Sequence, residues 1–362
     1  MSLAAVSGDI GGARAILPVL EYMYNHKQEF KIVDHGILAK LSDVNWPRIS
    51  IPEATKSRPG LFSENKVKAL IFTTSVKDTF PLKLARAASS QGIPVLCLLD
   101  NWMNYRHRLE IDGEPALIPD VYMVMDDLAK AEAIGEGVPE SVLRVVGQPA
   151  LGSLADEYQR WKKQNRAKYF ESAGLDITKK LIVFISEPVS NDQGSGPENP
   201  QYRGYTEKTV LKQFCAELQP FAADYQLCIA PHPRDDIAEL NILWERCREE
   251  MTGRLLLLKS GRQAVFLADG VAGMASVLLY EAWLMSRPVI SLQPGLNRLQ
   301  LAFMQKREGA ICITDARQWH EKVSVWMKEL ANSNLTNGFK DELSLHISAA
   351  ANVAGVIKEY MN

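Results

Sequence analysis

The residues with the clearest chemical potential lie in the small-residue loop Ala272–Ser276 and in the helix predicted after it. The first N–H groups of a helix have no intrahelical partner and lie at the positive end of its dipole, so they suit a phosphate. Glu281, one turn deeper, could accept hydrogen bonds from ribose hydroxyls. The candidate phosphate-binding residues are Gly273, Ala275 and Ser276. The alternative is an ordinary strand–helix turn without a ligand.

A second candidate site is the sequence Pro-His-Pro-Arg at 231–234, which follows a predicted strand. The two prolines restrict the backbone on both sides of His232. A histidine held in this way can hydrogen-bond a phosphate or act as acid or base near neutral pH. Arg234 could bind a diphosphate through two parallel hydrogen bonds. The alternative is a surface turn whose following aspartates cap the next helix.

Two carboxylates complete the candidate catalytic set. Asp100 ends an apolar run and could be a general base or part of a sugar-binding patch, or simply the N-cap of a helix. Asp9 has the same alternatives, and the nearby Gly11 and Gly12 would let a ligand approach the backbone closely. The spacing is not G-x-G-x-x-G; Asp34 near the end of the second strand keeps a nicotinamide dinucleotide site as an alternative.

Short apolar runs alternate with helical patterns along the whole chain, which predicts parallel sheets covered by helices on both faces. The strands predicted in the first half are 3–6, 31–33, 69–73, 95–99, 121–125 and 143–146. Those predicted in the second half are 181–185, 226–230, 255–258, 268–271, 289–292 and 310–313.

The two series predict an α/β protein of two facing Rossmann-like domains, 1–150 and 151–342, followed by a C-terminal helix at 343–362 that packs back on the first domain. Ligands of such sheets bind beyond the carboxyl ends of the strands, where the polar residues of this chain gather. This placement predicts a cleft between the two domains.

The composition argues against several classes of protein. The 362 residues include 41 Lys and Arg against 43 Asp and Glu, a net charge of −2, so no nucleic-acid partner is expected. The cluster Arg106–Arg108 is too short to change this, although it could meet one anionic ligand. Five scattered cysteines and six histidines show no metal-ligand spacing, and no metal site is predicted.

The same features predict a soluble protein of the cytoplasm. No secretory signal is visible, and the odd number of cysteines indicates a reducing compartment. The longest apolar stretch, 264–285, is interrupted by Asp269 and Glu281 and is better explained by a buried strand, loop and helix than by a membrane span. Peripheral contact with a membrane stays open, and the oligomeric state is not predicted.

Four segments together resemble the GT-B superfamily, which contains glycosyltransferases of two Rossmann-like domains and the related UDP-N-acetylglucosamine 2-epimerases. SGDIGGARAILPVL is similar to the Gly-rich opening of these proteins, and GVPESVLRVVGQPAL to their interdomain passage. PHPR is similar to their His-Pro strand end, and ADGVAGMASVLLYEAWLMSRPVISL to their donor-binding loop and helix. The likeness covers nearly the whole chain.

The resemblance implies a nucleotide-sugar donor, of the UDP or CDP/CMP type, held mainly by the second domain. The loop would take the diphosphate and Glu281 the ribose, with His232 and Arg234 near the phosphates or the sugar. A glycan or glycoconjugate acceptor would lie on the first domain, with Asp9 or Asp100 as base. Such transferases need no bound metal or other cofactor, because helix dipoles and basic side chains neutralise the leaving diphosphate.

Two departures from the family pattern make glycosyl transfer the first prediction. The "E-A-G-L-R" segment of the epimerases is missing after Asp100, and their double Glu is replaced by Tyr280-Glu281. Met274 also stands where Gly or Ser is expected, which leaves room for a divergent donor or lost activity. The alternatives are a UDP-sugar 2-epimerase-like enzyme and a non-catalytic nucleotide-sugar-binding protein.

Overall fold

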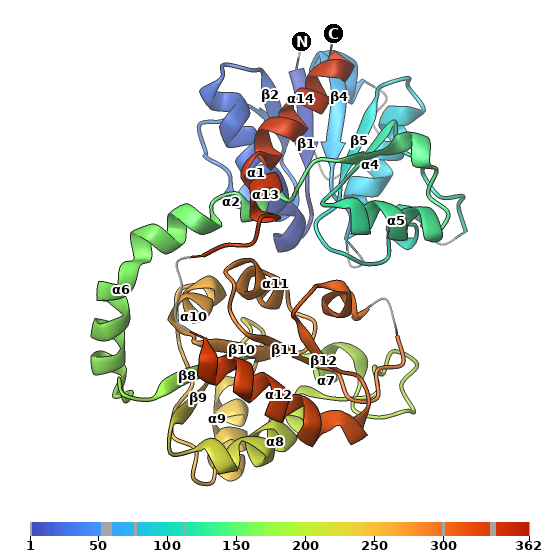
Figure 1. Ribbon diagram of the computed structural model, residues 1–362. Coiled ribbons are helices and arrows are strands. Elements are labelled where there is room, and N and C mark those ends of the chain that lie inside the picture. Colours follow the sequence, from blue (N-terminus) through green and yellow to red (C-terminus); the bar gives the residue numbers. More distant parts are fainter. Residues whose placement is uncertain are drawn as a thin grey trace. The chain divides into compact units, whose positions relative to one another are not determined.

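Parallel strands form two separate sheets, one in each of two structural units (Figure 1). The computed structural model describes residues 2–51, 60–75, 78–111, 113–298, 301–333 and 338–361, and within 162–165 only the backbone. The first unit consists of Met1–Ser153 with Glu342–Asn362, and the second of Leu154–Asp341. The predicted α/β class with two parallel-sheet domains is confirmed.

The first unit has a seven-stranded parallel sheet in the order β3-β2-β1-β4-β5-β6-β7. Its strands are β1 (Ser2–Val6), β2 (Phe30–Val33), β3 (Arg48–Ile49), β4 (Val67–Phe72), β5 (Val95–Leu98), β6 (Val121–Val124) and β7 (Leu143–Val145). Its helices are α1 (Ile10–Asn25), α2 (Gly36–Leu41), α3 (Leu61–Glu64), α4 (Phe80–Ser89), α5 (Asp127–Gly135), α13 (Leu343–Ile347) and α14 (Ala349–Met361). The central strands are buried throughout, because helices cover both faces of a parallel sheet.

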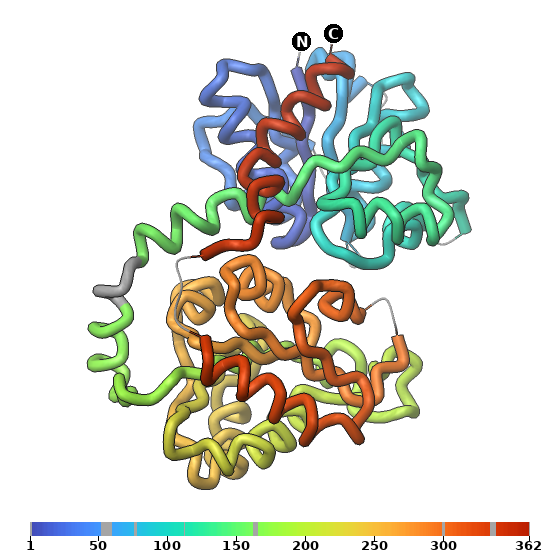
Figure 2. Tube along the Cα trace, in the orientation of Figure 1, coloured from blue at the N-terminus to red at the C-terminus, as the bar shows by residue number. Residues whose placement is uncertain are grey.

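The end of the chain belongs to the first unit. The trace in Figure 2 places its last segment, in red, beside the dark blue α1. There α14 packs on α1 and β4, and Lys68 Nζ donates to the carbonyl oxygen of Met361 at 3.1 Å. A single helix was predicted over this segment, but the structure divides it at Ser348 into α13 and α14.

The second unit has a five-stranded parallel sheet in the order β12-β11-β10-β8-β9. Its strands are β8 (Lys180–Ile185), β9 (Tyr225–Ala230), β10 (Gly270–Gly273), β11 (Val289–Leu292) and β12 (Ile311–Ile313). Its helices are α6 (Leu154–Ala173), α7 (Val189–Gln193), α8 (Glu207–Leu218), α9 (Ile237–Cys247), α10 (Gly261–Leu267), α11 (Val277–Leu284) and α12 (Trp319–Asn332). A hydrophobic core joins α8, α9 and α12 to one face of this sheet.

Two of the predicted strands are wrong in part. The segment 255–258 is no named strand: of its residues only Leu255 pairs with β9, through an isolated bridge to Ile229. Gly253, with φ +138°, lies just before the segment, and Leu257 is 70% exposed. The strand predicted at 268–271 begins two residues later, as β10, because the preceding apolar residues form α10. Gly273 is therefore the last residue of a strand rather than part of the loop.

Candidate functional site

The polar residues of the first unit meet where the chain changes direction in the sheet. β1 lies between β2 and β4. The chain leaves β1 toward β2 on one side and leaves β4 toward β5 on the other, and the point where the direction reverses is the usual place for a ligand. The ends of β1, β4 and β5 deliver Ser7, Gly8, Asp9, Thr73 and Asp100 to this edge. The strand-end rule therefore identified these residues from the sequence alone.

Asp9 caps α1 and has an altered acidity. Its Oδ1 accepts the backbone N–H of Gly12 at 2.9 Å, which is the N-cap role considered from the sequence. Burial, and then the charge of Asp100, raise the pKa of Asp9, against the opposing effects of the Gly12 N–H, Ser75 and Arg108. Asp9 therefore keeps its proton to a higher pH than an ordinary aspartate.

Asp100 forms an ion pair with Arg108. Arg108 Nη1 lies 2.6 Å from Asp100 Oδ1, and the two side chains are only 12% and 10% exposed. Burial opposes the charge of Arg108, but Asp100, together with Tyr122 and Asp9, outweighs it and raises the pKa of the guanidinium. Arg108 belongs to the basic cluster that could meet an anionic ligand, and in the structure it pairs with the carboxylate of Asp100. Gln148 fixes the backbone here, since its Nε2 donates to Asp100 O at 3.0 Å.

Gly11 and Gly12 let these groups approach the start of α1. A Cβ built on Gly11 would lie 2.5 Å from Asp100 Oδ2 and 3.8 Å from Asp9 Oδ1, so both carboxylates face the same backbone position. This places an acidic group with raised pKa beside an ion-paired one, an arrangement that acid–base catalysis can use.

Replacing Gly12 with Ala is expected to destabilise the first unit by about 1–3 kcal/mol. The new Cβ would lie 2.0 Å from Thr73 Oγ1 and 2.6 Å from Ser7 Oγ, two buried hydroxyls that are hydrogen-bonded at 2.7 Å. Chemical denaturation checks this, with Gly135→Ala in α5 as the control, because a Cβ there meets nothing within 4 Å. Equal stability of the two variants would contradict the tight packing.

A histidine–aspartate pair that the sequence analysis missed lies at the same edge. His35 Nε2 is 2.7 Å from Asp78 Oδ2, and a Cβ on Gly8 would lie 2.1 Å from that oxygen. His35 also packs against Phe80, with ring centroids 4.1 Å apart and the ring planes tilted by 38°. The signal was present, because His35 follows the predicted second strand by two residues.

In the second unit, the predicted phosphate loop is occupied by a carboxylate of the chain itself. Glu187, two residues after β8, accepts the backbone N–H of Ala275 at 2.6 Å. Burial raises the pKa of Glu187, while the N–H groups of Met274, Ala275 and Ser276 and the charge of Arg203 favour its charged form. The N–H groups of the loop thus contact a carboxylate of this chain, and their phosphate-binding role stays a prediction. Ser276 caps α11 by accepting the N–H of Leu278.

Glu281, predicted to bind ribose, forms a two-pronged ion pair within the protein. Its oxygens lie 2.9 Å from Nε and 2.9 Å from Nη2 of Arg262, and its side chain is 8% exposed. Arg262 also contacts Glu157 at 2.7 Å. Burial works against the charge of Arg262, but the two carboxylates outweigh it and raise its pKa. The ribose role of Glu281 stays a prediction, with this competing partner.

The His-Pro turn ends β9 and holds its histidine in a defined state. His232 Nδ1 accepts the backbone N–H of Arg234 at 3.1 Å, so the proton of the neutral ring lies on Nε2. Burial, followed by the charge of Arg234, lowers the pKa of His232. Arg234 Nη1 and Nη2 lie 2.5 and 2.6 Å from the two oxygens of Asp192, so it makes the two-pronged contact predicted, but to a carboxylate of the chain.

β8 lies between β9 and β10, so the His232 turn and the loop at 274–276 flank one strand end of the second unit. The structure therefore groups the predicted residues into two sets: Asp9, Gly11, Gly12 and Asp100 in the first unit, and His232, Arg234, Gly273, Ala275, Ser276 and Glu281 in the second. Within the described ranges no cluster of His, Cys, Asp and Glu is arranged to ligate a metal, and no helix is long and apolar enough to cross a membrane.

The chain matches solved structures over nearly its whole length, but it matches no sequence family. No family model and no curated protein sequence matches the chain. Among solved structures, the UDP-GlcNAc 2-epimerase of Methanocaldococcus jannaschii matches with a TM-score of 0.66 at 15% identity, covering 99% of this chain and 100% of that one. The UDP-GlcNAc 2-epimerase of Neisseria meningitidis, bound to UDP-GlcNAc, has a TM-score of 0.67 at 13% identity, with 99% and 100% covered.

A glycosyltransferase of Rickettsia africae matches equally well, with a TM-score of 0.68 at 11% identity over 99% of this chain and 97% of that one. At these identities the comparisons show the fold, which is GT-B-like as the sequence resemblance implied. They do not show the reaction.

Proposed function

We propose that this protein is an enzyme that acts on a nucleotide sugar. The observation that carries the proposal is the pair of carboxylates, Asp9 and Asp100, that face one backbone position at the switch point of the first unit. A GT-B-like fold provides the context, since its solved neighbours include proteins bound to UDP-GlcNAc. In the second unit the loop at 274–276 would receive the donor phosphates once Glu187 leaves it, and His232 would donate from Nε2.

Isomerisation at carbon 2 of the sugar is the first reaction to test, because most of the similar solved structures described above are 2-epimerases. Glycosyl transfer to a glycan or glycoconjugate is the second candidate. It is favoured by the transferase neighbour and by the single Glu281, preceded by Tyr280, where the epimerases carry two glutamates.

The two reactions would use the carboxylates differently. An epimerase must remove the proton of a carbon and return a proton to its other face, which needs one group as base and one as acid. A transferase must take the proton of an acceptor hydroxyl while the nucleotide diphosphate leaves. Asp9, with its raised pKa, is suited to the acid, and Asp100 is the candidate base.

The deciding experiment incubates the protein with UDP-GlcNAc in D₂O and follows the sugar by NMR. Deuterium at carbon 2 without an acceptor supports the epimerase, whereas UDP release that requires an added glycan supports the transferase. A thermal-shift panel of UDP, CDP, CMP, GDP, ADP and NAD establishes the nucleotide, since a ligand at 100 times its Kd adds about 2.7 kcal/mol of stability. A panel with no shift, or with a shift for NAD alone, would contradict the proposal.

The pH dependence of the reaction is expected to report on Asp9. A general acid works only while it is protonated, so activity should fall as the pH rises through the pKa of Asp9, which lies above the usual value for an aspartate. Asp9→Asn is expected to lower the rate and to remove this fall of kcat with rising pH. A fall that persists unchanged in the variant would assign the titration to another group.

A further inference from the structure

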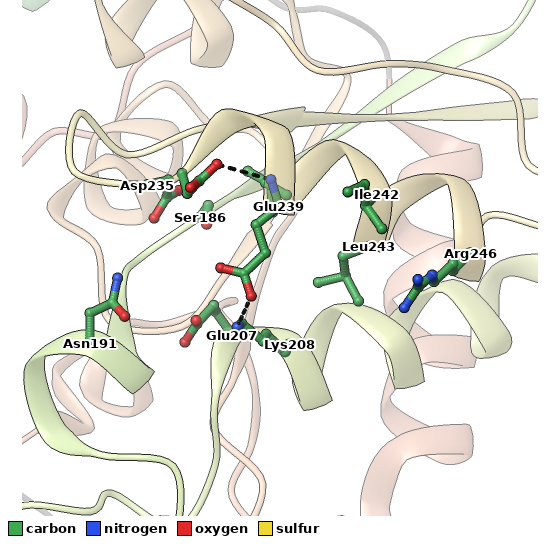
Figure 3. A pocket seen from close by; sticks show the side chains of 11 residues that line it. Ser186, Asn191, Glu207, Lys208, Asp235, Glu239, Ile242, Leu243 and Arg246 are labelled. Carbon is green, nitrogen blue, oxygen red and sulfur yellow. Dashed lines mark hydrogen bonds and ion pairs between the residues drawn. The ribbon is translucent and has the colours of Figure 1, made fainter.

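Two helices of the second unit, α8 and α9, lie side by side, and each carries a cysteine near its C-terminal end. Figure 3 shows both helices from the pocket that they line, where Glu239 in the first turn of α9 is paired with Lys208 at the start of α8. At the other end of the helices, Cys215 in the last turn of α8 meets Cys247, the last residue of α9. Their Sγ atoms lie 3.4 Å apart.

The backbone around this pair of thiols is held by one side chain. Gln219 Nε2 donates to the carbonyl oxygens of Cys215 and Arg248, at 2.9 and 3.1 Å, and Gln219 Oε1 accepts the N–H of Glu250 at 3.0 Å. One amide group thus bridges the ends of both helices next to the two cysteines. A disulfide bond is about 2.05 Å long, so the two Sγ atoms must approach by only about 1.4 Å, which rotation of the side chains can supply.

The two thiols differ in exposure and in acidity. Cys215 is fully buried, whereas Cys247 is 9% exposed. The hydrogen bond with the Cys215 thiol, with smaller effects of the backbone N–H and of Lys212, lowers the pKa of Cys247 against burial and the charge of Glu249. The same contact raises the pKa of Cys215. Because the thiolate is the reactive form, Cys247 reacts first and Cys215 is placed to react with its product.

The other three cysteines are not paired in this way. Within the described part of the chain, the contact between Cys215 and Cys247 is the only one between two thiols. Cys97 lies in the first unit, and Cys228 in β9 and Cys312 in β12 lie at opposite edges of the second sheet. Burial raises the pKa of Cys228 and of Cys312 to about 12, so both stay protonated near neutral pH.

We propose that Cys215 and Cys247 are a redox-modification site, at which hydrogen peroxide closes a disulfide between α8 and α9. The Cys247 thiolate attacks one oxygen of the peroxide, the O–O bond breaks, and the other oxygen leaves as hydroxide, which takes up a proton to become water. The sulfenic acid on Cys247 then reacts with Cys215: the S–S bond forms, the S–O bond breaks, and the oxygen leaves as water with the Cys215 proton. The two sulfurs lose two electrons, which reduce one peroxide to two waters.

The disulfide closes a loop of the chain that contains the turn at 231–234 and all of α9. The two cysteines are 32 positions apart in the sequence. A cross-link over this separation restricts the unfolded chain, so the oxidised protein is expected to melt about 5–10 °C higher than the reduced one. Dithiothreitol should restore both thiols by exchange. The site is independent of the proposed function, because the cross-link forms without a nucleotide sugar.

The test treats the full-length, folded protein with a small excess of hydrogen peroxide and then blocks the remaining thiols with N-ethylmaleimide. Trypsin separates the two cysteines by cleavage after four basic residues, Lys212, Arg234, Arg246 and Arg248. Mass spectrometry is expected to find the peptides of Cys215 and Cys247 joined, and to find them separate after dithiothreitol. Two thiols that survive the peroxide, a sulfinic acid on Cys247 without a cross-link, or a cross-link that forms only in denaturant would each overturn the proposal.

Single variants assign the role of each thiol. Cys215→Ala lacks the second thiol, so peroxide should leave a sulfenic acid on Cys247 that dimedone traps. Cys247→Ala should leave Cys215 unmodified. Cys228→Ala is the matched control, because Cys228 lies on the same tryptic peptide as Cys215 and its loss should leave the cross-link intact. A cross-link that is kept in Cys215→Ala and lost in Cys228→Ala would refute the assignment, and the parent protein gives its own answer even if a variant fails to fold.

Discussion

Asp100→Asn is expected to lower kcat by about 10²–10⁴-fold, the range that a positioned acid or base contributes. Asn keeps the size of the side chain and an oxygen that can accept from Arg108, so the ion pair becomes a hydrogen bond from the charged guanidinium to a neutral amide. Asn cannot, however, take a proton from a substrate. The loss should therefore appear in kcat, while the affinity for the nucleotide is unchanged.

The matched control is Asp127→Asn, an exposed aspartate in the first turn of α5 of the same unit. Asp127 is exposed, and exposed substitutions of this kind change stability by less than about 0.5 kcal/mol, so the variant stays folded. Its kcat should therefore stay within a factor of about two. Steady-state kinetics and a thermal scan of both variants check the prediction. An Asp100→Asn enzyme that folds and retains its kcat would remove Asp100 from the chemistry.

The fold was predictable because its strands are continuous apolar runs bounded by polar turns. Both sheets follow from that pattern, including the strand ends that deliver Asp9 and Asp100. The failures lie where the pattern is ambiguous: the strand predicted at 268–271 begins only at Gly270, because Ala268 is the C-cap of α10 and an apolar residue suits a helix end and a strand start equally well. The two-residue β3 is too short to leave any periodic signal.

The partners of the site residues were not predictable, because they come from distant parts of the chain. Glu187 and Ala275 are 88 residues apart, and Arg234 and Asp192 are 42 apart. Strand-end logic identifies which residues reach an edge of a sheet, but it does not tell which side chains pair there. The sequence places Glu187 at a strand end. That its carboxylate accepts the N–H of Ala275 depends on β8 and β10 being neighbours in the sheet, which the sequence does not tell.

The burial of these internal ion pairs determines how readily a ligand can replace one partner of each pair. The Arg234–Asp192 pair is 51% and 32% exposed, so releasing Arg234 for a phosphate costs little. Glu281 and Arg262 are 8% and 14% exposed, and Arg262 would lose its two-pronged contact in a buried place if Glu281 turned to a ribose. The contacts therefore favour Arg234 as a ligand-binding residue and Glu281 as a structural one.

Glu281→Ala is accordingly expected to lower the free energy of unfolding of the second unit by about 3–5 kcal/mol, the cost of removing one side of a buried ion pair. Glu157→Ala should cost less, because Glu157 is 35% exposed and Arg262 keeps both contacts to Glu281. Replacing Arg262 and Glu281 together with Leu should recover much of the loss, since no charge then stays buried alone. Denaturation followed by tryptophan fluorescence measures all three. A ribose-binding role predicts the opposite pattern for Glu281→Ala: stability near that of the parent protein and weaker binding of the nucleotide.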